Sequence, residues 1–338
     1  MNLSERKAAF VQLGHRLQNI GQDEFIRLAG MARASNGWFT EESIQSALHG
    51  LTKMLSEEQL SKWLSHYPEE VKSPKNIGVV MAGNIPFVGF HDLLSVLIAG
   101  HHLQAKLSSQ DQVLMKFIIE ELRQIAPGFQ ISMPDKLNDA DAFIATGSDN
   151  SARYFHYYFG KKPHIIRKNR TSVALLTGEE SKEDHLALAH DIFTYYGLGC
   201  RNVSKIYYPS SLNLNELIAN FEDHSAVANH HKYRNNYDYN KSILLVNHVD
   251  HKDNGFLLLQ ESDALVSPIS VLFTESYESL DECVNQLYEM EDKIQCVVGK
   301  EAVITNAGSV VPFGQAQQPA VWDYADGVDT MKFLHDLS

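Results

Sequence analysis

Cysteine is scarce in this chain of 338 residues, which contains three: Cys200, Cys283 and Cys296. Three cysteines cannot all pair with one another, and these are widely separated in the sequence. Small secreted domains that rely on disulfides are rich in cysteine. We therefore expect a reduced, cytoplasmic protein in which each thiol can be judged by its own surroundings.

Basic residues are also few. Lys and Arg number 29 against 42 Asp and Glu, and the formal net charge is -13 at pH 7. Sequence-independent binding to a phosphate backbone needs a basic surface, so this balance argues against a nucleic-acid partner. It leaves open a local basic pocket for a nucleotide.

Long uncharged apolar segments are missing, so we expect no membrane span. The first residues, MNLSERKAAFVQLGHRL, are too polar for a signal peptide. The chain has 16 histidines, but no Cys/His set has the spacing of a zinc site, and we expect no bound metal. With 44% hydrophobic and 21% charged residues, the composition is that of an ordinary globular protein long enough for two domains.

The first seventy or so residues have the periodicity of helices. Thr40 is the predicted N-cap of one helix, with apolar residues at helical spacing from Ile44 to Leu51. Ser56 and Gln59 predict a capping box for the next. We expect these helices to be structural.

From residue 74 onward, strands alternate with helices. A short apolar strand over 77–81 ends in Ala82-Gly83-Asn84, and a second, over 104–107, meets a predicted helix cap at Ser108 and Ser109. A third strand precedes Thr146-Gly147-Ser148 and another helix. Strands that alternate with helices imply a parallel, doubly wound sheet.

The same pattern continues after Cys200. Residues 203–209, 241–249 and 267–273 are predicted as strands, and Ser279 is predicted to cap a helix that leads into a strand at 294–299. The economical prediction is an α/β protein with two lobes. We divide it into a helical region (1–73) packed on a cofactor domain (74–190), a catalytic domain (191–311) and a C-terminal segment (312–338) that returns to the cofactor domain.

Cys200 stands in the string GLGCR. Glycines on both sides of Leu198 allow the backbone to approach a substrate closely, neighbouring main-chain N–H groups could bind an oxyanion, and Arg201 adds positive charge. The alternative is that Cys200 is a small core residue. That second role is the simpler interpretation of Cys283, in an amphipathic helix, and of Cys296, in an apolar strand.

Other candidate residues follow the predicted strands. Asn84 could offer an amide to a developing oxyanion, although Gly83-Asn84 on its own is more typical of a turn. Lys106 with Ser108, and Gly147 with its neighbours, stand where a strand gives way to a helix, the usual place for phosphates and riboses. Neither string matches a dinucleotide or Walker fingerprint.

Taken in order, these motifs resemble the aldehyde dehydrogenase superfamily. The order is a strand that ends in Asn-x-Pro, then AKLSS, then ATGS, then GLGC before an apolar strand. More specifically, the chain is similar to the LuxC-type acyl-CoA reductases, the fatty acid reductase branch, in AGNIPFVGFHDLL, YYGLGCRNVSKIYYP and VPFGQAQQPAVWDYADGVDTMKFL. The resemblance runs from about residue 77 to the end.

The resemblance assigns roles to several residues. It implies that Cys200 is the nucleophile and that Asn84, with the main-chain N–H of Cys200, forms the oxyanion hole. It implies that Lys106 holds the adenosine ribose and that Gly147-Ser148 lie near the cofactor phosphates. It also implies a Rossmann-like cofactor domain and a catalytic domain.

Three departures from the superfamily pattern refine the expected chemistry. IIRKNRTSVALL replaces the segment that carries the glutamate base, with Arg167 or a neighbour at its position, which favours reduction of an acyl thioester over oxidation of an aldehyde. Ser109 replaces an acid that would repel a 2′-phosphate, so we expect NADPH to be accepted, with NADH as the alternative. Ala264 replaces the glutamate that grips the nicotinamide ribose.

The resulting hypothesis is an NADPH-dependent reductase of a long-chain acyl-CoA or other acyl thioester that acts through a cysteine-bound acyl group. The alternatives are a non-catalytic acyl- or nucleotide-binding protein with the same fold, and an aldehyde-oxidising dehydrogenase. The resemblance also admits an acyl-activating partner protein and a homo-oligomer. It leaves the acyl chain length and the donor (CoA, carrier protein or acyl phosphate) open.

Overall fold

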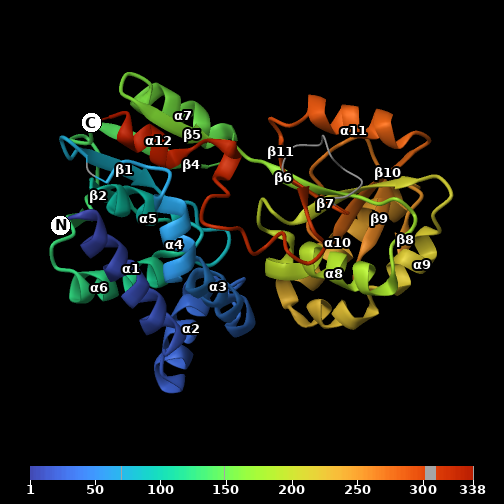
Figure 1. Cartoon of the computed structure of the whole chain (residues 1–338). Coiled ribbons are helices and arrows are strands. Elements are labelled where there is room, and N and C mark those ends of the chain that lie inside the picture. The colour runs from blue at the N-terminus through green and yellow to red at the C-terminus, as the bar shows by residue number, and fades with distance from the viewer. Residues whose placement is uncertain (70, 148, 301–309, 338) are drawn as a thin grey trace. The chain divides into compact units, whose positions relative to one another are not determined.

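The computed structural model describes residues 1–69, 71–147, 149–300 and 310–337, and the chain forms two compact units (Figure 1). Unit 1 comprises Met1–Asn169 and Pro319–Ser338, and unit 2 comprises Arg170–Gln318. Each unit is built on a largely parallel sheet with helices. The predicted α/β class with parallel sheets is therefore confirmed.

The five-stranded sheet of unit 1 has the order β3-β2-β1-β4-β5, and all neighbours run parallel. The chain moves outward from the central β1 to β2 and β3, then returns to β4 and β5 on the other side. The order therefore reverses between β1 and β4, and open α/β sheets bind ligands at the carboxyl ends of the strands beside such a switch point. The strands are β1 (Asn76–Val80), β2 (His102–Lys106), β3 (Ile131–Ser132), β4 (Ala142–Thr146) and β5 (His164–Arg167).

Helices connect these strands in the predicted alternation: α5 (Phe90–Ala99), α6 (Gln112–Ile125) and α7 (Asp149–Phe159). The predicted cap at Ser108 and Ser109 is wrong, because α6 begins only after Asp111. Residues 108–111 instead form a turn, in which the main-chain N–H of Asp111 donates to the carbonyl of Ser108 (3.2 Å). The side chain of Ser108 accepts from Gln110 N–H (3.3 Å) within the same turn.

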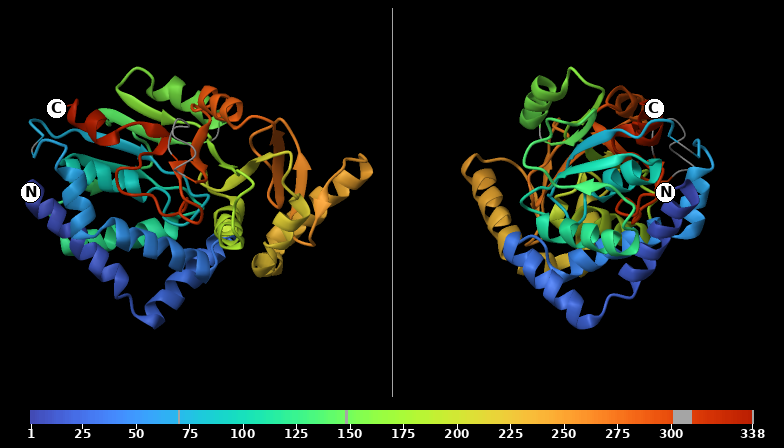
Figure 2. Two further views of the ribbon diagram at one scale, coloured as in Figure 1. Left: turned by 45° about the vertical axis from the view of Figure 1, so that its right-hand side comes forward. Right: turned by 90° about the vertical axis from the view of Figure 1, so that its left-hand side faces the viewer.

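The N-terminal region is helical, as its periodicity predicted. Thr40 and Ser56 each cap a helix by accepting a hydrogen bond from the main-chain N–H three residues later. The first helix contacts α5 and α6, and the second contacts α6. In Figure 2 these helices (blue) lie on the side of the sheet away from α7 (green). They are α1 (Leu3–Gln18), α2 (Gln22–Ser35), α3 (Glu41–Met54) and α4 (Glu57–Leu64).

A buried ion pair ties the C-terminal segment into unit 1. Arg167, 3% exposed at the end of β5, donates through Nη1 to both carboxylate oxygens of Asp92 on α5 (2.8 and 2.7 Å). Its Nη2 donates to Oγ1 of Thr330 (2.9 Å) at the start of α12 (Thr330–His335). One guanidinium therefore joins β5, α5 and the last helix of the chain, which follows the short 3-10 helix η3 (Ala325–Gly327).

Unit 2 holds a seven-stranded sheet with the order β12-β11-β6-β7-β10-β9-β8. The strands run parallel except for the short β8, which is antiparallel to β9. The strands are β6 (Thr171–Leu175), β7 (Val203–Pro209), β8 (Lys252–Asp253), β9 (Leu258–Glu261), β10 (Val271–Tyr277), β11 (Ile294–Val298) and β12 (Val310–Val311).

The pairing of β6 places the start of unit 2. β6 lies between β7 and β11, so the chain from Arg170 onward belongs to the second sheet. The boundary expected after residue 190 falls inside α8 (Lys182–Phe193), within unit 2. The C-terminal segment, expected to return from residue 312, rejoins unit 1 from Pro319.

The strand predicted over 241–249 is wrong. Residues up to Val246 are the last turns of α10 (His231–Val246), whose N-cap His230 accepts from the main-chain N–H of Tyr233 (3.4 Å). The apolar run of residues 243–246 resembles a buried strand, yet of these four only Leu244 is buried. Leu244 and Tyr237, seven residues apart on one helix face, pack against the apolar side chains of β9 and β10.

The described part of unit 2 has four further helical segments: η1 (Thr194–Gly197), α9 (Leu214–Ala219), η2 (Glu222–Asn229) and α11 (Leu280–Glu289). The predicted cap Ser279 accepts from Glu282 N–H at the start of α11 (3.4 Å). Among the described residues, no helix has both the length and the apolar character needed to cross a membrane.

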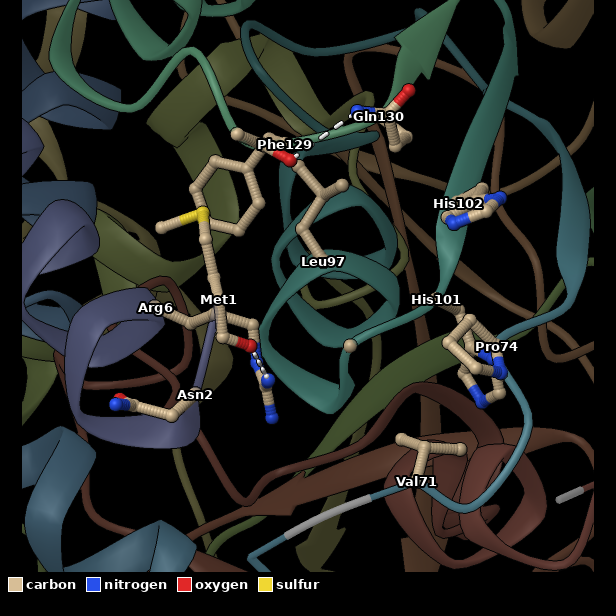
Figure 3. Close-up of a pocket in the computed structure, with 12 residues that line it drawn as sticks. Met1, Asn2, Arg6, Val71, Pro74, Leu97, His101, His102, Phe129 and Gln130 are labelled. Carbon is tan, nitrogen blue, oxygen red and sulfur yellow. Dashed lines mark hydrogen bonds between the residues drawn. The ribbon is translucent and has the colours of Figure 1, made fainter.

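A cavity of about 420 Å³ lies in unit 1 beside the amino ends of β1 and β2 (Figure 3). Two of the polar side chains around it bond to the backbone: Arg6 donates to the carbonyl of Ile98 (2.8 Å), and Nδ1 of His101 accepts from Lys75 N–H (3.0 Å). Because ligands of such sheets bind at the carboxyl ends, this cavity is at the other edge from the candidate site. We assign no chemistry to it.

We expect Arg167→Met to lower the free energy of unfolding of unit 1 by about 3–5 kcal/mol, because it leaves Asp92 as a buried carboxylate without its cation. The double variant Arg167→Met/Asp92→Leu removes both charges and should recover most of that loss. Urea denaturation followed by tryptophan fluorescence measures this, since Trp38, Trp63 and Trp322 all lie in unit 1. Equal losses in the single and double variants would contradict the assignment of the pair.

Candidate active site

Cys200 lies in the turn between η1 and β7, in unit 2, and its side chain is exposed. Cys283 and Cys296 are 2% and 1% exposed, as expected for core residues. Burial raises the pKa of the Cys283 thiol to about 12, which keeps it protonated and unreactive at neutral pH. Cys200 is thus the one cysteine of the three that solvent and reagents can reach.

The backbone just before Cys200 is strained. Tyr195, Tyr196 and Gly197 have φ angles of 53°, 59° and 78°, three consecutive residues in the left-handed region. That conformation costs a residue with a side chain about 1–2 kcal/mol, and only glycine adopts it freely. Strain of this kind persists where surrounding contacts hold it, and it is often found beside functional residues.

Asn202 supplies many of those contacts. Its Oδ1 accepts from the main-chain N–H of Gly199 (2.8 Å), and its Nδ2 lies within hydrogen-bond distance of the carbonyls of Asp191, Ile192 and Thr194 (2.9, 3.3 and 2.7 Å). The two N–H hydrogens of this buried amide are shared among carbonyls in the last turn of α8 and at the start of η1, and its oxygen holds the turn that carries Cys200. We did not predict this role, although an asparagine directly after a glycine-rich turn was a usable signal.

Asp191 anchors the C-terminal FGQA string within unit 2. Its buried carboxylate accepts from the main-chain N–H groups of Gly314 (2.6 Å) and Ala316 (3.0 Å). Burial raises the pKa of Asp191 to about 7, and those two N–H groups offset part of the rise. Residues 314–316, part of a motif that the resemblance singled out, are thus attached to the helix that leads to Cys200.

Asn84 lies in unit 1, in the loop after β1, and is half-buried. The loop packs tightly on the segment after β2: a Cβ at Gly83 would come within 2.4 Å of Ser108 Oγ. Glycine is therefore required at position 83. The structure brings the β1 and β2 loops into direct contact, at the carboxyl ends of their strands.

Lys106 and Ser109 are exposed at the carboxyl end of β2, while Ser108 is half-buried. Nζ of Lys106 donates to the main-chain carbonyl of Asp135 (2.9 Å). An ammonium group has three hydrogens to donate, so this bond leaves capacity for a ligand hydroxyl.

Gly147 follows β4 on the other side of the switch point, and its N–H donates to the carbonyl of Arg167 (3.4 Å). Ser148 lies outside the residues that the structure describes. The candidate cofactor residues of unit 1 that are described therefore share the carboxyl edge of one sheet.

Arg167, which the sequence aligned with the missing base, is buried in the ion pair with Asp92. Its side chain is a structural group of unit 1. Ala264 is exposed in the loop after β9, and its main-chain N–H donates to Ser262 Oγ (3.2 Å). Among the described residues, no three His, Cys, Asp or Glu side chains are placed to hold a metal ion.

Asp111 is a buried acid that we did not predict. It is 2% exposed, and both carboxyl oxygens are buried with no hydrogen-bond partner in the described part of the chain. Burial raises the pKa of Asp111 to about 8, and the main chain at Phe87, in the loop that carries Asn84, offsets only part of this rise. The carboxyl group is therefore protonated at neutral pH.

No protein-family model matches the chain, and no curated protein matches it. Solved structures do. Aldehyde dehydrogenase 21 from Physcomitrella patens, in complex with succinate, has a TM-score of 0.67 at 13% identity, over 100% of this chain and 84% of that one. An aldehyde dehydrogenase of Mycobacterium tuberculosis complexed with NAD+ has a TM-score of 0.69 at 11% identity over the same shares.

An NADP-dependent enzyme of E. coli has a TM-score of 0.67 at 11% identity, over 93% of this chain and 78% of that one. These likenesses extend over nearly the whole chain, at identities too low to carry a specific activity. They show that the chain has the fold of the aldehyde dehydrogenases, as the motif order predicted.

We expect Asp111→Asn to remove a pH dependence from the stability of unit 1. The folded chain keeps the Asp111 proton up to about pH 8, whereas an unfolded aspartate loses it near pH 4, at its ordinary pKa. Between these values the unfolded state binds fewer protons, so stability falls as the pH rises, by at most about 1.4 kcal/mol per pH unit for one group.

Urea denaturation with tryptophan fluorescence at pH 5 to 8 measures this slope, and exposed Asp139→Asn is the matched control. The slope should become shallower only for Asp111→Asn. An unchanged slope would mean that Asp111 is ionised in the folded protein.

Proposed function

We propose that this chain is a nicotinamide-dependent oxidoreductase that acts at the aldehyde level, and more specifically an NADPH-dependent reductase of a long-chain acyl-CoA or related acyl thioester. The observation that carries the proposal is the exposed Cys200 thiol, on a strained turn pinned by Asn202, in a chain with the aldehyde dehydrogenase fold. A reactive cysteine needs access and a fixed position, and Cys200 has both.

Residues at the carboxyl edge of unit 1 suit the cofactor. Lys106 and Ser109 offer exposed donors there, and in the position of Ser109 no carboxylate repels a 2′-phosphate. In this assignment, which follows the resemblance, Lys106 holds the adenosine ribose, Ser108 and Ser109 also contact the cofactor, and Gly147-Ser148 lie near its phosphates. When bound, NADPH supplies the hydride for reduction.

The chain's own groups perform the acyl transfer. The Cys200 thiolate attacks the acyl carbon, a C–S bond forms, and the bond to CoA breaks as CoA leaves as its thiol after taking a proton. In this proposal the main-chain N–H of Cys200 donates to the acyl oxygen as its negative charge develops, and the resemblance implies the amide of Asn84 as the second donor. After reduction, the bond between Cys200 and the substrate carbon breaks, which releases the aldehyde and restores the thiolate.

The absence of a carboxylate base favours reduction of an acyl thioester over oxidation of an aldehyde. Residues 164–178, which include the segment where an oxidising enzyme has its glutamate, contain no Asp or Glu. Arg167 is committed to Asp92 and cannot take that role. Without a group to activate water, a cysteine-bound acyl group persists until it is reduced.

A non-catalytic acyl- or nucleotide-binding protein is the second candidate. Ala264 favours it, because the resemblance implies a ribose-binding glutamate at that position and alanine offers no hydrogen bond. A protein of this kind would bind substrate or cofactor without turnover.

Turnover separates these functions. We expect the purified chain to consume NADPH when mixed with a long-chain acyl-CoA, and to release free CoA and a fatty aldehyde in equal amounts, measured by absorbance, thiol titration and mass spectrometry. Cys200→Ala should lower the rate on the order of 10³-fold or more, because it removes the nucleophile. Cys283→Ala, at a buried cysteine of unit 2, is the control and should retain activity.

NADH in place of NADPH tests the expected cofactor preference in the same assay. A fatty acid as the product would contradict the reductase assignment and favour a hydrolytic, oxidising enzyme. Binding of acyl-CoA or NADPH without any product would favour the non-catalytic candidate.

A further inference from the structure

A buried hydroxyl lies directly behind Cys200. Oγ of Ser172, on β6, donates to the main-chain carbonyl of Cys200 (3.0 Å), and Ser172 is completely buried. Sγ of Cys296, on β11, lies 3.1 Å from the same oxygen. A serine hydroxyl has one hydrogen, and the carbonyl takes it, so the Cys296 thiol is the donor to Ser172.

Both strands beside Ser172 are irregular at its position. On one side Ser172 pairs with Val203 while the next residue pairs with Lys205, which leaves Ser204 as an extra residue in β7. On the other side β11 also carries one more residue than β6 between the pairs at Ile294 and Val297. Bulges of this kind change the direction of side chains and are frequent beside functional sites.

These bonds fix the backbone on both sides of Cys200. The carbonyl of Gly199, in the peptide that also contains the Cys200 N–H, accepts from Asn202 N–H (3.1 Å). The next peptide is held through the Cys200 carbonyl by Ser172, whose own N–H donates to the carbonyl of Asn202 (3.4 Å). With both peptide planes held, the directions of the Cys200 N–H and side chain are set.

We propose that Ser172 is a positioning residue for Cys200, and that the Cys296 thiol completes the hydrogen bonding of its hydroxyl. The inference deepens the proposed function, on which it rests: the main-chain N–H that it orients is the one assigned to the acyl oxygen. It also gives a reason for the fully buried serine of β6.

Alkylation of Cys200 by iodoacetamide tests this without a substrate. Cys283 and Cys296 are buried, so the reagent reaches Cys200 selectively, and peptide mass spectrometry verifies the site. We expect Ser172→Ala to lower the alkylation rate at neutral pH by about five-fold, equivalent to the roughly 1 kcal/mol that one hydrogen bond contributes. The pH profile of the rate should change as well, because a thiolate is stabilised only by groups held in fixed directions around it.

Two variants distinguish positioning from general loosening of the fold. Ser172→Thr keeps the hydroxyl and should restore most of the rate. Ser204→Ala is the matched control, since Ser204, on the neighbouring strand β7, also donates to a main-chain carbonyl, that of Leu265 (2.7 Å). It should leave the rate within two-fold of wild type, about 0.4 kcal/mol.

If Ser172→Ala does not fold, Ser172→Ala/Cys296→Ala replaces it, because that double variant removes both members of the buried hydrogen bond. Its alkylation rate should fall as far, while Cys296→Ala alone stays near wild type. An unchanged rate and pH profile after loss of the Ser172 hydroxyl, or an equal fall in Ser204→Ala, would overturn the inference. A separate comparison tests Cys200 as the nucleophile: the wild-type alkylation rate should exceed that of a free thiol at the same pH.

Discussion

Unit 1 depends on the buried ion pair of Arg167 and Asp92. Arg167 pairs with Asp92 and reaches Thr330, so three segments far apart in the sequence meet at a single guanidinium. A buried charge in this position is costly unless it is paired, and the two terminal nitrogens of Arg167 find their partners only when α5, β5 and α12 are all in place. The ion pair thus fixes where α12 packs against β5 and α5 in unit 1.

Buried polar side chains also determine the conformation of the turn that carries Cys200. Left-handed backbone at Tyr195 and Tyr196 is unfavourable by itself, and the amide of Asn202 offsets it by bonding the end of α8 and the turn together. Asp191 then attaches residues 314–316 to that helix, and Ser172 holds the turn from behind. The candidate nucleophile is exposed, but the backbone beneath it is held by buried polar side chains.

Local patterns in the sequence were sufficient for much of the fold. Alternation of strands and helices predicted the parallel sheets, and side-chain caps at Thr40, Ser56 and Ser279 marked helix starts, because these features depend on neighbours within a few residues. The wrong predictions arose where contacts between residues far apart in the sequence determine the secondary structure. Residues 243–246 are apolar enough for a strand, but packing on β9 and β10 uses only one face of a helix there.

The candidate site was likewise predictable from the sequence only in part. The order of short motifs pointed to Asn84, Lys106 and Cys200, and the structure places the first two at the carboxyl ends of β1 and β2 and exposes the third. The supporting residues were not predictable. The roles of Ser172 and Asn202 come from hydrogen bonds across strands and to the end of a helix, and Arg167 acquires its partner from a helix 75 residues away.

The central claim is that Cys200 carries the acyl group. The most direct measurement is mass spectrometry of the intact protein, and of its peptides, after mixing with a long-chain acyl-CoA in the absence of NADPH. The account predicts one acyl group on the peptide that contains Cys200, absent from Cys200→Ala and lost as aldehyde when NADPH is added. An unmodified Cys200, or an acyl group on another residue, would contradict it.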